Sequence, residues 1–204
     1  MGRPKNPTRR DELLEKCCDH LLEHGVSGVS LRPLAAEVGA SPRTLLYHFG
    51  SREELIAEAL RRCRARYLAV ADALVRDATP VGGDIAGVLA TLWTHSATPA
   101  ARPFLLLFLD AYTCALRSSD GEGEILTELF GRWHDRITGE LTAVGADPGP
   151  AASVASLAIA VHRGLLIEWL ATGDSARLDA ARAAALDMLG ALASRALARG
   201  GPGA

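Results

Sequence analysis

Residues that start and stop helices recur along the whole chain, and this punctuation constrains the fold more than any other feature. Ser51 with Glu54 forms a capping box, and Pro42 after Ser41 suits the first position of a helix, where its missing amide costs no hydrogen bond. Gly39 follows an apolar helical repeat, where a helix-ending residue in the left-handed conformation is expected. No stretch alternates apolar and polar residues with the period of a strand. The pattern predicts an all-α fold.

About nine helices follow from these signals, and Ser30 is expected to cap the second of them. Their predicted bounds are residues 8–24, 31–38, 42–49, 51–78, 84–97, 99–117, 122–144, 148–172 and 175–199. A chain of 204 residues is long enough to bury a sizeable core among these helices.

Charge is distributed unevenly along the chain. The net charge is −2, yet residues 1–67 carry 12 Lys and Arg against 9 Asp and Glu. A basic front end is compatible with a polyanionic partner without requiring one. Arg3, Lys5, Arg9 and Arg10 are interpreted either as a basic arm that follows DNA or as a solvated tail.

Cysteine usage and hydropathy favour a cytoplasmic protein. The four cysteines are Cys17, Cys18, Cys63 and Cys114. None belongs to a C-x-x-C pair, so we expect reduced thiols, and no apolar run of a secretory signal is visible. Residues 151–171 have the length of a membrane span, but His162, Arg163 and Glu168 would be costly inside a bilayer. We therefore interpret this stretch as a buried helix of a soluble protein, without a membrane partner.

One face of the first helix resembles half of a metal site, because Cys17, His20 and His24 share it. Three ligands from one helix rarely close a tetrahedron around an ion. We therefore predict no metal ion and no cofactor.

Two short helices joined by Gly39 and Ala40 have the proportions of a helix-turn-helix unit, whose second helix enters the major groove of DNA. Arg can bind guanine through two hydrogen bonds, Thr can contact a thymine methyl group, and Tyr or His can donate to phosphate. The side chains expected to point to the groove are Arg43, Thr44, Tyr47 and His48, with Arg32 in reach of it. Those expected to point inward are Leu45, Leu46 and Phe49.

Residues 25–55 also carry a recognisable set of positions. The set consists of Gly25, Ser30-Leu31, Leu34-Ala35, Gly39, Ser41, Thr44-Leu45, Tyr47-His48-Phe49 and Ser51-Arg52-Glu53-Glu54-Leu55. It resembles the DNA-binding region of the TetR/AcrR family of bacterial transcriptional regulators. The chain departs from the family pattern at Leu46, where Tyr is frequent, at Arg52, where Lys is frequent, and at His20, where an apolar residue is usual.

The resemblance implies a homodimer whose first three helices bind DNA. It implies DNA contacts at Arg32, Ser41, Pro42, Arg43, Thr44, Tyr47, His48 and Arg52. Helices five to seven would surround an effector pocket, and the last two helices would form a four-helix interface. The domains expected on this basis are a helix-turn-helix domain at 1–50, a connecting helix at 51–78, and an effector-binding and dimerisation domain at 79–204.

Aromatic residues in the back portion are either core packing or the lining of a pocket. Phe104, Phe108 and Tyr112 recur every four residues and make a stripe along one helix. The candidate ligand-binding residues are Trp93, Phe104, Phe108, Asp110, Tyr112, Thr113, Trp133, His134 and His162. The effector expected from such a lining is an apolar or aromatic small molecule.

The last two helices carry more small and aliphatic residues than one shallow core needs, so a two-fold interface between copies is expected, with burial inside one chain as the alternative. The helix at 51–78 is the expected lever between the two functions, with Arg61, Arg62, Arg64 and Arg66 on its exposed side.

The sequence thus predicts a dimeric transcriptional regulator, most simply a repressor of a palindromic operator, with an activator of the same fold as an alternative. No P-loop, nucleophile elbow, H-E-x-x-H or Rossmann motif is present, so an enzyme acting on an apolar ligand is the rival hypothesis from another class. An architectural binder indifferent to sequence fits less well with the small net charge.

Overall fold

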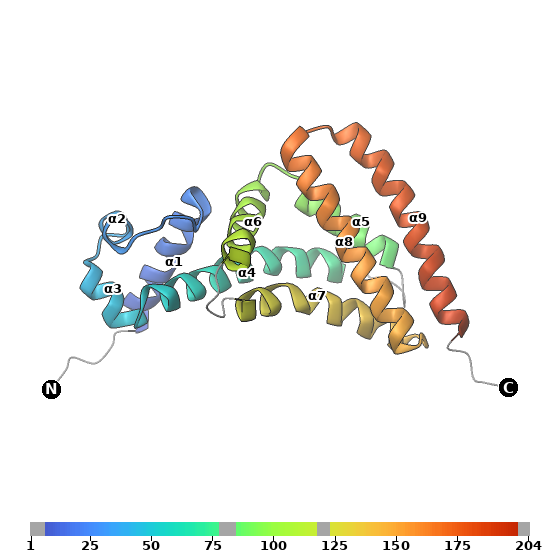
Figure 1. The fold of residues 1–204 in the computed structure, drawn as a ribbon, viewed down its shortest axis with the longest axis horizontal. Coiled ribbons are helices and arrows are strands. Elements are labelled where there is room, and N and C mark those ends of the chain that lie inside the picture. The colour runs from blue at the N-terminus through green and yellow to red at the C-terminus, as the bar shows by residue number, and fades with distance from the viewer. Residues whose placement is uncertain (1–6, 78–84, 118–122, 200–204) are drawn as a thin grey trace. The chain divides into compact units, whose positions relative to one another are not determined.

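The computed structural model describes residues 7–77, 85–117 and 123–199, and within these ranges every regular element is a helix. The helices are α1 (Pro7–His24), α2 (Leu31–Glu37), α3 (Pro42–Phe49), α4 (Arg52–Asp77), α5 (Ile85–Ser96), α6 (Arg102–Arg117), α7 (Gly123–Ala143), α8 (Pro148–Thr172) and α9 (Ser175–Arg199) (Figure 1). The predicted all-α fold and the order of the helices are confirmed.

Local capping explains where several helices begin. The Ser41 hydroxyl accepts from the Thr44 amide at 3.0 Å at the start of α3. Before α4, Ser51 and Glu54 form the expected capping box, in which each side chain accepts from the amide of the other. Ser30 is extended as a cap residue should be, but its side chain makes no capping bond, so that part of the prediction was wrong.

α6 begins three residues later than predicted. Thr98 forms a turn first, in which its carbonyl and hydroxyl oxygens both accept from the Ala101 amide, at 3.1 and 3.3 Å. The turn satisfies amides that a helix beginning at residue 99 would leave without partners, and the helix follows it.

The chain forms two compact units, which we call the N-terminal unit (Met1–Ala69 with Pro103–Leu129) and the C-terminal unit (Val70–Arg102 with Phe130–Ala204). The N-terminal unit contains α1, α2, α3, the first part of α4 and nearly all of α6. α4 therefore runs from one unit into the other. The functional division at residues 50 and 78 stays a prediction.

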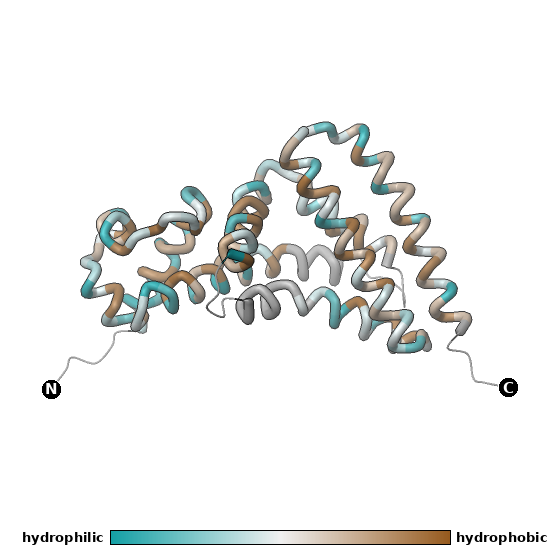
Figure 2. Tube along the Cα trace, in the orientation of Figure 1, coloured by the Kyte–Doolittle hydropathy of each residue, from teal (hydrophilic) through white to brown (hydrophobic). Residues whose placement is uncertain are grey.

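One hydrophobic core holds the N-terminal unit together, and the apolar positions that build it are visible along each helix in Figure 2. Its buried members include Leu13, Cys17 and Leu21 of α1, Leu34 of α2, Leu45 and Phe49 of α3, Leu55 and Cys63 of α4, and Leu107 and Ala111 of α6. Because α6 contributes to this core, it packs with α1 to α4 within the N-terminal unit.

The core of the C-terminal unit is rich in alanine. Its buried members include Val88 and Leu92 of α5, Ile137 and Leu141 of α7, Val154, Ala155 and Ala158 of α8, and Leu189, Ala193 and Ala196 of α9. Small side chains let helix backbones approach closely, which suits the packing of α8 against α9 in the hairpin they form (Figure 1).

α8 is long and apolar enough to cross a membrane by length and composition, with a mean hydropathy of 1.5 over its best 18 residues. This is weak evidence, because the core helix of a soluble protein passes the same test. Only 28% of that segment is buried within the chain, so much of its apolar surface is exposed.

Candidate DNA-binding surface and effector residues

α3 has one buried face and one exposed face. Leu45 and Phe49 are buried in the core of the N-terminal unit, one turn apart. Arg43 is exposed at the start of the helix, and Tyr47 is 49% exposed one turn further on. These two side chains are four residues apart, so they share the outward face of the helix.

Two of the predicted orientations on α3 were wrong. Leu46 was expected to point inward, yet it is 39% exposed and lies on the face of Arg43 and Tyr47. His48 was expected to point to the groove, yet it is 8% exposed, with its ring 5.2 Å from that of Tyr47. At about 100° per residue, Leu46 and His48 lie on opposite sides of the inward direction that Leu45 and Phe49 set, at similar angles to it. The helical period alone therefore does not decide which of the two is buried, and packing against the neighbouring helices does.

The other predicted DNA contacts lie at the start of α3, in the first turn of α2 and in the first turn of α4. Thr44 is partly buried and its hydroxyl lies 2.8 Å from that of Ser41, while Pro42 occupies the first turn. Arg32 is exposed in the first turn of α2. Arg52, in the first turn of α4, donates from Nε to the Val29 carbonyl at 2.8 Å. The structure therefore holds Arg52 against the chain preceding α2.

The basic residues near the N-terminus are partly structural. Arg10 donates to both carboxylate oxygens of Glu58, at 2.5 and 2.6 Å, and its guanidinium lies 4.8 Å from the centre of the Phe49 ring. Arg9 pairs with Glu12 at 3.0 Å within α1. Arg3 and Lys5 of the proposed arm lie outside the described residues.

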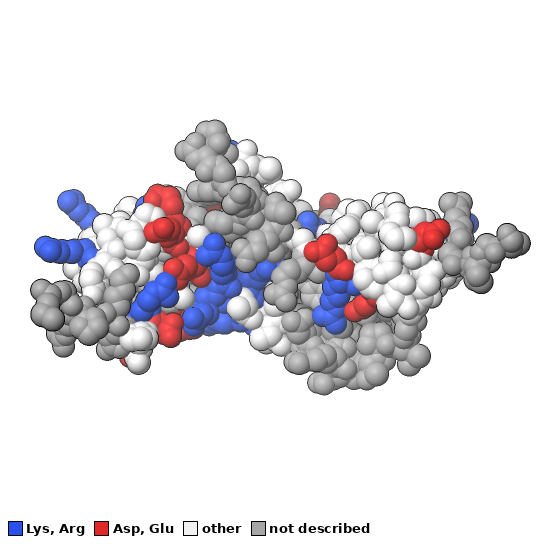
Figure 3. Space-filling model, turned by 90° about the horizontal axis from the view of Figure 1, so that it is seen from below, with Lys and Arg blue, Asp and Glu red and all other residues white. Residues whose placement is uncertain are grey.

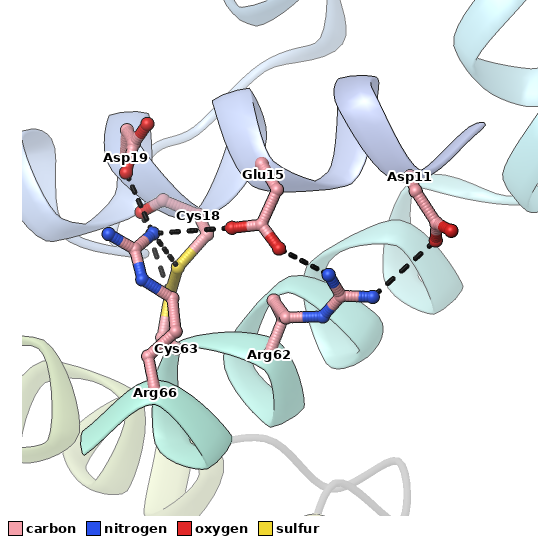
Figure 4. Close-up of polar contacts among 7 residues, drawn as sticks. All are labelled: Asp11, Glu15, Cys18, Asp19, Arg62, Cys63 and Arg66. Atoms are coloured by element: carbon pink, nitrogen blue, oxygen red, sulfur yellow. Dashed lines mark hydrogen bonds and ion pairs between the residues drawn. A yellow bond between two sulfur atoms is a disulfide. The ribbon is translucent and has the colours of Figure 1, made fainter. Parts of the chain in front are cut away.

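A ladder of charged side chains joins α1 to α4. Arg62 bonds to Glu15 and lies 3.5 Å from Asp11, while Arg66 lies 2.8 Å from Asp19 and 3.5 Å from the second oxygen of Glu15 (Figure 4). The carboxylates are spaced four residues apart along α1 and the two arginines four apart along α4, so both helices present one face to the ladder.

This ladder corrects the expectation that four arginines line an exposed side of α4. Arg64 is 7% exposed, and Arg62 and Arg66 are paired with carboxylates of α1, while Arg61 is exposed. Figure 3 shows the resulting surface, on which basic and acidic side chains lie side by side over the N-terminal helices.

A disulfide between Cys18 and Cys63 adds a covalent link between the same two helices, with a Cα–Cα distance of 5.6 Å (Figure 4). The sequence favoured reduced thiols, and a spacing of 45 residues gave no sign of this pairing. Cys17 remains a free thiol, and burial raises its pKa to about 11. A thiol in that state is a poor nucleophile and a poor metal ligand at neutral pH.

The aromatic stripe of α6 contacts α4. The rings of Phe104 and Phe108 lie 5.6 and 6.1 Å from that of Tyr67, all within the N-terminal unit. Tyr112 and Thr113 are exposed further along the helix, and the Thr113 hydroxyl donates to the Leu109 carbonyl at 2.7 Å. These contacts fit core packing for the first two aromatic rings.

Asp110, predicted as a polar group of the effector pocket, holds the loop that follows α1. Its Oδ2 atom accepts from the amides of Val26 and Ser27, at 2.5 and 2.9 Å, and its Oδ1 atom accepts from the Ser27 hydroxyl. Burial raises the pKa of this carboxyl, but the hydrogen bonds from Ser27 and Val26 outweigh burial and hold it below its usual range. Asp110 is therefore ionised and ties α6 to the chain leading into α2.

The remaining candidates lie in the C-terminal unit. The ring of Trp93 in α5 lies 6.2 Å from that of His162 in α8, edge to face. Trp133 in α7 packs against the core of the C-terminal unit, and the guanidinium of Arg136 lies 5.3 Å from the centre of its ring. His134 lies 3.6 Å from Asp135. The structure brings Trp93 and His162 together and places the α6 candidates in the other unit.

His162 is a neutral histidine at physiological pH. Burial lowers its pKa to about 4, with a further contribution from the positive charge of Arg163. A neutral imidazole beside an indole gives a polar group in apolar surroundings, which is typical of small-molecule sites.

Three small helices packed on one core, with the third exposing an Arg and a Tyr from its outward face, define a helix-turn-helix DNA-binding protein. The sequence model of the bacterial regulatory proteins of the tetR family matches residues 13–59, which span α1 to the first turns of α4. Residues 13–59 therefore match the DNA-binding region of tetR-family regulatory proteins, as the resemblance predicted.

Known relatives agree with this assignment. The HTH-type transcriptional regulator BetI of Brucella melitensis is 27% identical over 114 residues, which are 56% of this chain and 57% of the relative. The match thus spans little more than half the length of that relative.

Solved structures share the fold. A transcriptional regulator from Rhodococcus sp. Rha1 matches with a TM-score of 0.71 at 20% identity, covering 88% of this chain and 95% of that one. A regulator from Saccharomonospora viridis in complex with choline matches with a TM-score of 0.69 at 22% identity, covering 90% and 96%.

Proposed function

We propose that this regulator represses transcription by binding a palindromic operator as a homodimer and releases the operator when a small molecule binds its C-terminal unit. The observation that carries the DNA-binding half of the proposal is the outward face of α3. A helix whose exposed face presents Arg43, Leu46 and Tyr47 fits the major groove, which admits one α-helix.

Each side chain on this face has a distinct task. Arg43 suits the O6 and N7 atoms of guanine, and Leu46 suits the methyl group of thymine by apolar contact. Tyr47 and Arg32 suit phosphate oxygens, which fix the register of the helix without reading sequence. Ser41 and Thr44, which already bond to each other at the start of α3, are placed to approach the backbone or a base edge.

Replacing Arg43 with Ala is expected to weaken binding to the preferred DNA by about 1–3 kcal/mol and to broaden base preference at one position. The preferred site is first obtained by selecting bound fragments from random duplexes, and a two-fold symmetric consensus is expected. Affinities are then measured by fluorescence anisotropy at fixed salt for the consensus and for a scrambled duplex.

The matched control is Arg117→Ala, which removes an equal charge from the exposed end of α6 and should leave the preference unchanged. An equal loss on consensus and scrambled DNA in Arg43→Ala would argue against base reading by this residue. A consensus without two-fold symmetry would overturn the palindromic operator.

Dimerisation is assigned to α8 and α9, which we propose form a four-helix interface with a second copy. Leu157 and Ile167 of α8 and Met188 of α9 are 44%, 48% and 47% exposed. A second copy would remove this apolar surface from water. Two recognition helices would then meet successive major grooves about 34–36 Å apart.

Ile167→Glu is expected to shift the protein from dimer to monomer, because it places a charge on the exposed apolar surface that the proposed interface would bury. Sedimentation equilibrium measures the shift. Leu116→Glu is the control, because Leu116 is also exposed, at 68%, but lies at the end of α6. A monomeric wild type, or an Ile167→Glu dimer of undiminished affinity, would contradict the assignment.

We place the effector site in the C-terminal unit around Trp93 and His162, with Trp133 and His134 as further candidates. The paired indole and neutral imidazole favour an apolar or aromatic molecule, and the related fold that holds choline is consistent with a small organic ligand.

An effector changes DNA binding only if it has different affinities for two conformers of the protein. α4 runs between the units, and Asp110 fastens α6 to the loop after α1, so both helices are proposed to transmit the change.

A further inference from the structure

A histidine-rich cluster lies between α1 and α2 in the N-terminal unit. His20, His24 and Glu37 each present one ligand atom, and the three atoms lie within 4.8 Å of one another. His20 Nδ1 is 2.9 Å from Glu37 Oε2, and His24 Nε2 is 3.6 Å from Glu37 Oε1. The cluster lies outside the surfaces assigned to DNA, effector and dimerisation.

The spacing of these atoms fits a metal ion. Two histidines four residues apart on one helix present their rings on the same face, and here the ring centres are 4.6 Å apart. A tetrahedral ion with bonds of 2.0–2.1 Å sets neighbouring ligand atoms about 3.3 Å apart. The two measured nitrogen–oxygen distances lie on either side of that value, but they run to different oxygens of Glu37, and the three ligand atoms lie within 4.8 Å of one another. The half-exposed His24 side chain would have to move inward for all three atoms to reach one ion.

Burial leaves the cluster closed on one side and open on the other. The side chain of His20 is 9% exposed, whereas those of His24 and Glu37 are each 47% exposed. His20 Nδ1 is buried and makes no hydrogen bond of good geometry despite its short distance to Glu37. An ion could therefore enter from the solvent side and keep water as its remaining ligand.

The charges around the cluster favour a cation. The carboxylate of Glu37 faces both histidines, at 2.9 and 3.6 Å, and its side chain is 47% exposed. Glu23 lies 3.9 Å from His24 Nε2, and Lys16 donates to the Val38 carbonyl beside Glu37. The carboxylate of Glu37 is the charged ligand, with Glu23 beside it.

We propose that His20, His24 and Glu37 bind one divalent transition-metal ion, for which Zn²⁺ is the best fit. Two imidazole nitrogens and one carboxylate form a borderline donor set that suits Zn²⁺ and its neighbours in the Irving–Williams order. Cys17, which shares the helix face in sequence, is a buried core residue and not a ligand. The third ligand comes instead from α2.

A bound ion would tie α1 to the last residue of α2, directly before the turn that leads into α3. Since the cluster is formed by the folded arrangement of two helices, the ion would stabilise the folded state over the unfolded chain. The proposal is independent of the operator, the effector and the dimer interface.

The test is a titration of the untagged, chelator-stripped full chain with Zn²⁺ by isothermal titration calorimetry, with Co²⁺ as a spectroscopic probe of the ligand field. Wild type is expected to bind one ion per chain and to show a higher midpoint of thermal unfolding with Zn²⁺. Glu37→Gln and His24→Ala are each expected to weaken binding at least about tenfold. Both replaced side chains are half exposed, so the variants should fold, which circular dichroism checks.

Glu23→Gln is the matched control, because it removes a neighbouring carboxylate that does not reach His20, and its affinity should equal that of wild type. The proposal is overturned if wild type binds no ion stoichiometrically. It is equally overturned if Glu37→Gln or His24→Ala keeps wild-type affinity, since the ion would then lie elsewhere and the cluster would be an ion pair only.

Discussion

Reduction of the Cys18–Cys63 disulfide is expected to lower the free energy of unfolding by about 4 kcal/mol. The link closes a loop of 45 residues, and in the chain-entropy description this is the stability that such a loop withdraws from the unfolded state. Urea unfolding of the purified chain, with and without a thiol reductant, measures the difference. Thiol titration under denaturing conditions should find two fewer free thiols in the oxidised sample.

Two variants separate this effect from a general response to reductant. Cys18→Ser with Cys63→Ser removes the link and should be insensitive to reductant, while Cys114→Ser keeps the link and should respond as wild type does. An oxidised wild type with all four thiols free would contradict the disulfide itself. Equal stability with and without reductant would contradict its contribution.

Acidification from pH 6.5 to about 4 is expected to destabilise the chain by up to about 3 kcal/mol through His162 alone. Its pKa is lowered from 6.5 to about 4 in the folded chain, so the unfolded state binds the proton first. The stabilising contribution is therefore complete above pH 6.5 and is lost progressively as the pH falls toward 4. Unfolding by urea at several pH values measures the slope.

Other groups titrate in the same direction, so the contribution of His162 has to be isolated. Burial also lowers the pKa of His95, and the pKa values of Asp110, Glu37 and Glu53 are lowered as well. His162→Gln keeps a neutral polar side chain at every pH, and its stability should fall less than that of wild type between pH 6.5 and 4.5. Parallel pH profiles for the two proteins would show that His162 is not desolvated.

The order of the helices could be predicted because caps and stops are local. α3, α8 and α9 match their predicted bounds, since Ser41-Pro42, Asp147-Pro148 and Gly173 determine them within a few residues. It was harder to predict which side chains of α3 point inward, because an eight-residue helix offers only two turns from which to infer the inward direction. His48 and Leu46 were exchanged for that reason.

Contacts between distant residues could not be predicted from spacing. Asp110 reaches Val26 across 84 positions, and Cys18 pairs with Cys63 across 45. Glu37 joins His20 and His24 from another helix, whereas the sequence grouped these histidines with Cys17 of the same helix and gave no sign of Glu37. A single sequence shows which residues share a helical face, but which faces meet is decided by tertiary packing.

The disulfide and the charged ladder between α1 and α4 limit how the recognition helix can move. With the two helices clamped from Asp11 to Asp19 against Arg62 to Arg66, the first four turns of α4 and the DNA-binding helices form one stiff body. A hinge within that body would require breaking a covalent bond and several ion pairs. In the proposed dimer, a swing that alters the distance between the two recognition helices is therefore expected to pivot beyond Arg66, and loosening the link between α1 and α4 is expected to make that motion less directed rather than larger.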